Sequence, residues 1–214
     1  MRLRVGLALL AVLLLVTACS VTRGSGQLAT ESRPVSGFTK VELSGTGDAT
    51  IEQTGTESLS ISAEDNLLPR LTSEVSGDTL TLGTEPNTSI VPTKPITYSL
   101  TVKDLTGLVV SGSGNIQVPN LTTTVLSIKI SGSGTITAGG TVNDQDLDIS
   151  GSGHYQAEQL PSKTVKAAIS GSGTASVVAT DALDVKISGS GTLTCSGNPQ
   201  IKQEISGSGK LIKK

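Results

Sequence analysis

The tetrapeptide Ser-Gly-Ser-Gly recurs at a nearly constant interval, and this repetition constrains the fold more than any other feature of the chain. Its six copies begin at Ser111, Ser131, Ser150, Ser170, Ser188 and Ser206. Successive copies are 20, 19, 20, 18 and 18 residues apart, and a variant, Ser-Gly-Thr-Gly, begins at Ser44. A fixed period near 20 residues indicates stacked repeats, each of which is one supersecondary unit.

Apolar residues flank every copy with the period of a β-strand. The residue before each tetrapeptide is aliphatic, as at Ile130, Ile149 and Ile169, and the position two residues earlier is apolar in every copy but the last. After the tetrapeptide, alternate positions are apolar again, for example Ile136 and Ala138. A period of two places these side chains on one face of an extended chain. On this parity the glycines also face inward, whereas the serines and the variable residue after them face outward.

A single repeat of this kind cannot bury its own apolar face. Stacked repeats align equivalent residues at the ~4.8 Å spacing of neighbouring strands and close a continuous core. We therefore predict an all-β fold, a parallel β-helix (solenoid) with coils of 18–20 residues. Glycine would let the coil wall bend, or approach the opposite wall where a Cβ would not fit. The outward serines would form two columns of hydroxyl groups: Ser111, Ser113, Ser131, Ser133, Ser150, Ser152, Ser170, Ser172, Ser188, Ser190, Ser206 and Ser208.

The first 18 residues have the composition of a signal peptide. Two arginines precede an apolar run, residues 5–16, that is too short to span a bilayer as a stable helix. The following Val16-Thr17-Ala18-Cys19 resembles a lipobox, which implies cleavage before Cys19 and a diacylglycerol on its thiol. The alternative is an ordinary secretory signal with an incidental cysteine. We expect an extracytoplasmic lipoprotein, periplasmic or on the cell surface, held to a membrane by acyl chains at Cys19.

The remaining chain divides into a tether and one folded domain. Residues 20–34 are polar and aperiodic, so we predict that residues 19–34, the lipidated cysteine included, form a flexible tether. The solenoid domain would then span residues 35–214. The repeat is interrupted at about residues 56–102, where short alternating segments and turn residues predict antiparallel hairpins. Such hairpins would cap the N-terminal end, because an open solenoid end is an unpaired strand edge.

The chain contains few residues suited to catalysis or metal binding. Its one histidine, His154, lies at an outward position, and Cys195 falls on an inward column, where a small buried apolar residue is expected. Asp144, Asp146 and Asp148 share one strand face, but no other coil repeats this pattern. A solvated surface is therefore favoured over a weak Ca²⁺ contact. We expect no enzyme activity, cofactor or metal, and a carbohydrate-active enzyme is the least favoured alternative.

Charge and surface composition narrow the classes of partner. The formal net charge of −2 is spread without blocks, and the absence of a basic stripe argues against nucleic acid. The outward serine columns have two interpretations. Serine beside glycine suits a tight corner and keeps the wall soluble. Alternatively, the columns form a flat polar surface for a glycan, another envelope protein or a second copy of the chain.

Several segments together resemble one known family. They are the lipobox, Asn66-Leu67-Leu68, the strand at residues 98–102 before Leu105-Thr106-Gly107-Leu108, and the recurring Ile-Ser-Gly-Ser-Gly. They resemble the bacterial GIN-domain family, described as auto-transporter adhesin head domains, over about residues 35–214. The resemblance implies a β-helical, surface or periplasmic domain, and it carries no functional residues. We therefore predict a non-enzymatic adhesion or envelope-binding module, and the alternative is a structural lipoprotein that self-associates through its strand edges.

Overall fold

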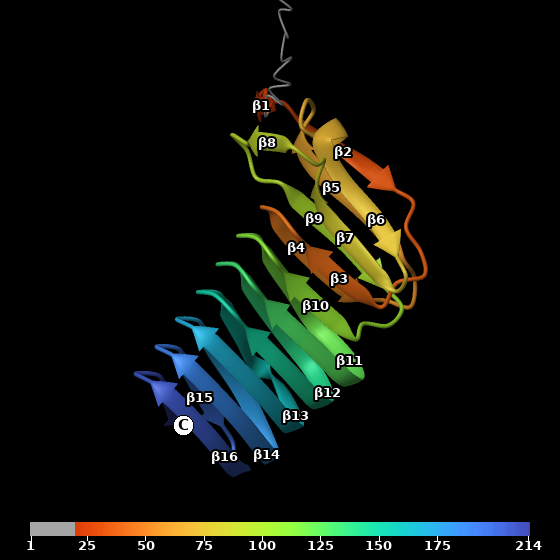
Figure 1. Cartoon of the computed structure of the whole chain (residues 1–214). Helices are drawn as coiled ribbons and strands as arrows, with labels where there is room; N and C mark the ends of the chain where they lie inside the picture. Colours follow the sequence, from red (N-terminus) through yellow and green to blue (C-terminus); the bar gives the residue numbers. More distant parts are fainter. Residues whose placement is uncertain (1–19) are drawn as a thin grey trace, which may run out of the picture.

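The structure is a computed structural model that describes residues 20–214, so the predicted signal peptide and Cys19 lie outside the described residues. The described chain forms a parallel β-solenoid of about 6 turns, and Figure 1 shows its strands stacked from the N-terminal to the C-terminal end. Among residues 20–214, no helix has the length and apolar character needed to cross a membrane. The predicted fold class is confirmed.

Parallel pairing joins the regular coils in chain order. The strands are β10 (Gly107–Val110), β11 (Asn115–Ile130), β12 (Thr135–Ile149), β13 (His154–Gly171), β14 (Thr174–Gly189), β15 (Thr192–Ser196), β16 (Gln200–Gly207) and β17 (Lys210–Lys213). Each of β11 to β14 pairs in parallel with the next along the chain, and β14 then pairs with both β15 and β16. The last strand, β17, pairs with β15.

The aliphatic residues that precede each tetrapeptide stack in one file through the core. Ile130 lies beside Ile149, Ile149 beside Ile169, and Ile169 beside Ile187. Each of the four is at most 1% exposed. Burying an aliphatic side chain of this size contributes about 1.5–3 kcal/mol, and this file is only one of several inward columns. The predicted parity and stacking are confirmed.

The glycines of the tetrapeptide are required by contact between successive coils. A Cβ on Gly132 would overlap the carbonyl oxygen of Gly112 in the preceding coil, and a Cβ on Gly134 would overlap that of Gly114. The same Gly112 oxygen accepts a hydrogen bond from the Ser133 amide at 3.1 Å. Glycine is therefore needed because successive coils stack closely along the solenoid axis. The predicted approach to the opposite wall is not the reason for these glycines.

The N-terminal part of the chain adds one more parallel coil and then an antiparallel cap. Strands β3 (Lys40–Leu43) and β4 (Asp48–Gln53) pair in parallel with β7 (Thr79–Thr84) and β9 (Thr97–Val102), respectively. Strand β6 (Leu71–Ser76) then pairs antiparallel with β7, and β5 (Ser58–Glu64) pairs antiparallel with β9. The predicted hairpins are confirmed, although the interruption also supplies β7 and β9 to the parallel stack.

The prediction of a flexible tether over residues 20–34 is wrong. Strand β1 (Ser20–Arg23) pairs in parallel with β8 (Thr88–Val91), and β2 (Leu28–Arg33) pairs antiparallel with β5. The Arg33 guanidinium donates hydrogen bonds to the carbonyl oxygens of Leu68, the first residue of the 3₁₀ turn η1 (Leu68–Arg70), and of Leu71, the residue after it. The described fold therefore includes residues 20–34: β8 provides a backbone ladder for β1, and the edge of β5 provides one for β2.

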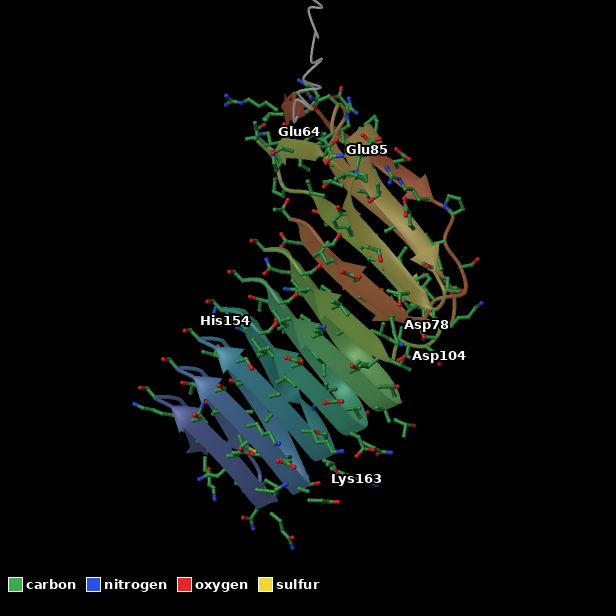
Figure 2. All side chains as sticks on the ribbon, in the orientation of Figure 1. Glu64, Asp78, Glu85, Asp104, His154 and Lys163 are labelled. Carbon is green, nitrogen blue, oxygen red and sulfur yellow. The ribbon has the colours of Figure 1, made fainter. Side chains whose placement is uncertain are left out.

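A buried carboxylate also fixes this N-terminal segment. Glu64, labelled at the N-terminal end of the molecule in Figure 2, is 0% exposed. It accepts hydrogen bonds from the Thr93 hydroxyl and amide and from the Gly26 amide. These bonds, the one from the Thr93 hydroxyl foremost, lower the pKa of Glu64 from 4.5 to about 2. The carboxylate thus stays ionised and joins the loop before β2 to the loop after β8.

Candidate functional site: a polar hollow beside the serine columns

The predicted serine columns lie on the surface of the solenoid. All twelve serines are exposed, as the outward parity requires. Within the described residues, only Ser111 among them has a side-chain hydrogen bond, from its hydroxyl to Glu42 Oε1 at 3.0 Å. The other hydroxyls are available to solvent or to a ligand. The tetrapeptides form a corner of each coil between two strands, for example between β10 and β11. The serine hydroxyls therefore line this corner, and the strands that follow it carry the hollow described next.

A hollow of about 590 Å³ opens on the outer face of the strands that follow the corner. Its floor is a column in which hydroxyl and amide side chains alternate: Thr50, Gln117, Thr137 and Gln156. Pro119, Gly139 and Glu158 also line it. The volume is within the range of small-molecule sites in proteins, about 300–1,000 Å³.

Irregular strand register produces the concavity. The pairing of β11 with β12 shifts between Val118 and Leu121, and that of β12 with β13 shifts between Thr137 and Gly139. Extra residues at such bulges bend the strand away from the regular ladder. Gly139 pairs with Gln159 across the shift and has no side chain to fill the space. The hollow therefore lies where the coil lengths change.

A second hollow of about 460 Å³ shares this floor and adds Asp48, Asn115 and Thr135. These polar groups are ordered by hydrogen bonds along the solenoid axis. Asn115 Nδ2 donates to Asp48 Oδ1 at 2.8 Å, and the Thr135 amide donates to Asn115 Oδ1 at 3.2 Å. On the floor itself, Thr137 Oγ1 donates to Gln156 Oε1 at 3.2 Å. The surface is thus a pre-arranged set of donors and acceptors.

The chemistry of the lining disfavours anionic ligands. Its polar groups are hydroxyls, amides and the carboxylates of Asp48 and Glu158, and none of the described residues that line either hollow is Lys or Arg. Phosphate and acidic groups are usually bound by guanidinium or ammonium groups. Amides and hydroxyls, in contrast, both donate and accept hydrogen bonds, as neutral polyhydroxyl ligands require.

The other residues considered from the sequence do not assemble into a reactive site. His154 is exposed, and its Nδ1 lies 2.7 Å from Thr174 Oγ1; Figure 2 shows it at the edge of the solenoid. Cys195 is 2% exposed, and burial raises the pKa of its thiol. Asp146 and Asp148 are exposed. No group of three or more His, Cys, Asp or Glu residues in the described part of the chain could hold a metal ion.

Sequence reasoning missed the hollow, although part of its pattern is visible in the repeats. Thr50, Gln117, Thr137 and Gln156 occupy the same outward position of successive coils, and all are polar. It also missed a buried hydrogen-bonded chain in which Tyr155 donates to Gln145 at 2.7 Å. Burial raises the pKa of Tyr155. That interior chain is structural, because it lies inside the core and not in the hollow.

Comparison with known proteins now places the chain. Residues 37–199 match the family model described as "Putative auto-transporter adhesin, head GIN domain". The chain belongs to this family. No curated protein matches the chain.

Solved structures are similar to this chain in fold. A crystal structure of a putative adhesin from Bacteroides fragilis NCTC 9343 is 24% identical, with a TM-score of 0.72, and the match covers 89% of this chain and 98% of that one. A putative lipid binding protein from Parabacteroides distasonis ATCC 8503 is 25% identical, with a TM-score of 0.61, over 91% of this chain and 99% of that one. The family description favours an adhesin-like, non-enzymatic role and an extracytoplasmic or surface location.

Proposed function

We propose that this GIN-domain protein is a lipid-anchored adhesion module of the bacterial cell envelope that binds neutral glycans in the polar hollow. The observation that carries the proposal is the floor column Thr50, Gln117, Thr137 and Gln156. Four alternating hydroxyl and amide groups at successive strands offer donors and acceptors at a repeat of ~4.8 Å. A saccharide presents hydroxyl groups of both kinds, so it can satisfy several of them together.

The composition of the hollow also sets the expected strength of binding. Phe38, Tyr98 and Tyr155 are the only aromatic residues of the sequence, and all three are buried. No aromatic face is therefore available for a sugar ring to stack upon. Binding at one site should be weak, and adhesion would depend on many copies acting together on a surface. The serine columns extend the polar surface beside the hollow.

The proposal includes a lipid anchor at Cys19. The described fold begins at Ser20, the next residue along the chain, with strand β1. An acylated Cys19 would therefore hold the N-terminal end of the solenoid close to the membrane and direct the rest of it outward. Mass spectrometry of the protein purified from bacterial membranes should find diacylglycerol on Cys19. A mature chain with an unmodified cysteine would contradict this part of the proposal.

A glycan array followed by calorimetry tests the hollow directly. The wild-type domain should bind neutral glycans, and the double variant Gln117→Ala/Gln156→Ala should bind the same glycans at least about tenfold more weakly. This loss corresponds to about 1.4 kcal/mol, or one to three hydrogen bonds. The matched control is Ser176→Ala/Thr194→Ala, which changes the next two residues of the same column outside the hollow. Equal binding by both double variants, or no binding of any neutral glycan, would refute the proposal.

A further inference from the structure

The C-terminal end of the solenoid is an open strand edge. Strand β16 pairs with β14 on one side, and no strand among residues 20–214 pairs with its other side. Its core-facing residues continue the inward columns but are only partly covered, and Ile205 is 38% exposed. The N-terminal end is different, because the antiparallel strands β2, β5 and β6 cover it. An uncovered edge with apolar side chains is suited to pairing with another strand.

The sequence of β16 is complementary to itself when two copies run antiparallel. It contains Ile201-Lys202-Gln203-Glu204-Ile205, which is symmetric about Gln203 in its pattern of apolar, charged and amide residues. We propose that a second copy of this chain pairs here, β16 against β16, about a two-fold axis at Gln203. In this register Ile201 lies opposite the partner's Ile205, and Lys202 lies opposite the partner's Glu204. Both pairs occur twice, because a two-fold interface is isologous.

The charges of the preceding coil support this register. Within one chain, Lys202 Nζ lies 3.4 Å from Asp184 Oδ2, and Lys186 Nζ lies 3.6 Å from Glu204 Oε2. The outer face therefore already alternates in sign from one coil to the next. In the proposed dimer, the partner's Glu204 lies next to Lys202, and the partner's Lys202 lies next to Glu204. The alternation of charge therefore continues across the interface. Opposite charges on directly facing residues stabilise a strand pair, whereas like charges destabilise it.

Gln203 is the one polar residue in the column of side chains three positions before the tetrapeptide. At this position the neighbouring coils carry Val185 and Ala167, both buried, whereas Gln203 is exposed. An amide group both donates and accepts hydrogen bonds, so two Gln203 side chains that meet at the two-fold axis can bond to each other. A single polar residue in an apolar interface also fixes its register. If the edge of β16 were unpaired, the side-chain amide of Gln203 at the end of this column would have no hydrogen-bond partner in the protein.

Strand β17 lacks this complementarity and limits the pairing to β16. Lys210, Lys213 and the adjacent Lys214 are all basic, and the segment contains no acid. Pairing through β16 would join two molecules tip to tip. Their β1 strands would then lie at the two far ends, because β1 and β16 lie at opposite ends of the solenoid in Figure 1. The polar hollow lies on β4 and β11 to β13, so this pairing does not depend on the proposed glycan binding.

Sedimentation equilibrium of the chain from Ser20 onward tests the pairing. The wild type should show a monomer–dimer equilibrium, and the single variants K202E and E204K should each weaken the dimer about 10- to 100-fold, since each places like charges opposite one another twice. An equimolar mixture of the two variants should dimerise again, because one chain then carries two acids on β16 and the other two lysines. Circular dichroism verifies that both variants are folded.

Two results would overturn the inference. The first is a wild-type chain that stays monomeric up to about 1 mM, the limit of weak association. The second is a dimer that both single variants retain, or that mixing them fails to restore, since either shows that Lys202 and Glu204 do not face each other. Glycan binding by a monomeric wild type would leave the proposed function intact while it removes this interface.

Discussion

The substitution Gly132→Ala should destabilise the solenoid although it adds only one methyl group. The new Cβ would overlap the carbonyl oxygen of Gly112, which is backbone and cannot rotate away. Relief requires the two coils to separate, which strains the hydrogen bonds between them, from the Ser133 amide to Gly112 O at 3.1 Å and from the Ser131 amide to Val110 O at 2.9 Å. Overpacking costs about 1–3 kcal/mol, and each weakened hydrogen bond adds up to about 1 kcal/mol. We expect a loss of about 2–4 kcal/mol, or ~5–15 °C in Tm.

The first copy of the motif provides the matched control. Gly45 occupies the equivalent position, but a Cβ there would meet no atom within 4 Å. Gly45→Ala should therefore be neutral, or stabilise by about 0.4–1 kcal/mol through the lower entropy of the unfolded chain. Thermal unfolding followed by far-ultraviolet circular dichroism measures both variants. The explanation by close stacking fails if G132A melts with the wild type, or if G45A loses as much stability as G132A.

Three further predictions concern the core and the buried polar groups. Ile149→Ala should cost about 2–5 kcal/mol in denaturant unfolding, whereas Val125→Ala on the surface should stay within about 0.5 kcal/mol, and similar losses would show that the parity is wrong. Because the pKa of Glu64 is lowered to about 2, its contribution to stability is complete above the ordinary value of 4.5 and is lost as the pH falls toward 2. The Tm of Glu64→Gln should therefore change less over this pH range than that of the wild type. If Tm falls equally with pH in both proteins, Glu64 is not the group that titrates. Cys195 should react with a thiol reagent only after denaturation, and rapid reaction in the native state would contradict its burial.

The repeat pattern was sufficient to predict the fold, because every coil has the same alternation of apolar residues and nearly the same length. The file of Ile130, Ile149 and Ile169 follows from a period of two within coils of nearly constant length. The glycine positions were predicted too, but their reason was not. Which backbone atoms approach a glycine depends on the offset between successive coils, and that offset becomes visible only when they are stacked.

Features that depend on one particular neighbour could not be predicted. Residues 20–34 are polar and aperiodic, and they are ordered by the free edge of β5, by Glu64 and by the carbonyl groups that Arg33 contacts. The hollow arises from register shifts near Gly139, and local sequence does not show where a strand pair slips. The serine columns were placed correctly on the surface, whereas the concave surface beside them was missed for this reason.

Nuclear magnetic resonance mapping of a bound neutral glycan tests the central functional claim most directly. Titration of the isotope-labelled domain with a glycan that it binds should shift the backbone amide signals of Thr50, Gln117, Thr137 and Gln156, together with the side-chain amides of the two glutamines. Signals from Ser176 and Thr194, farther along the same column, should stay in place. Shifts confined to another face of the solenoid would contradict the assignment of the hollow as the binding site.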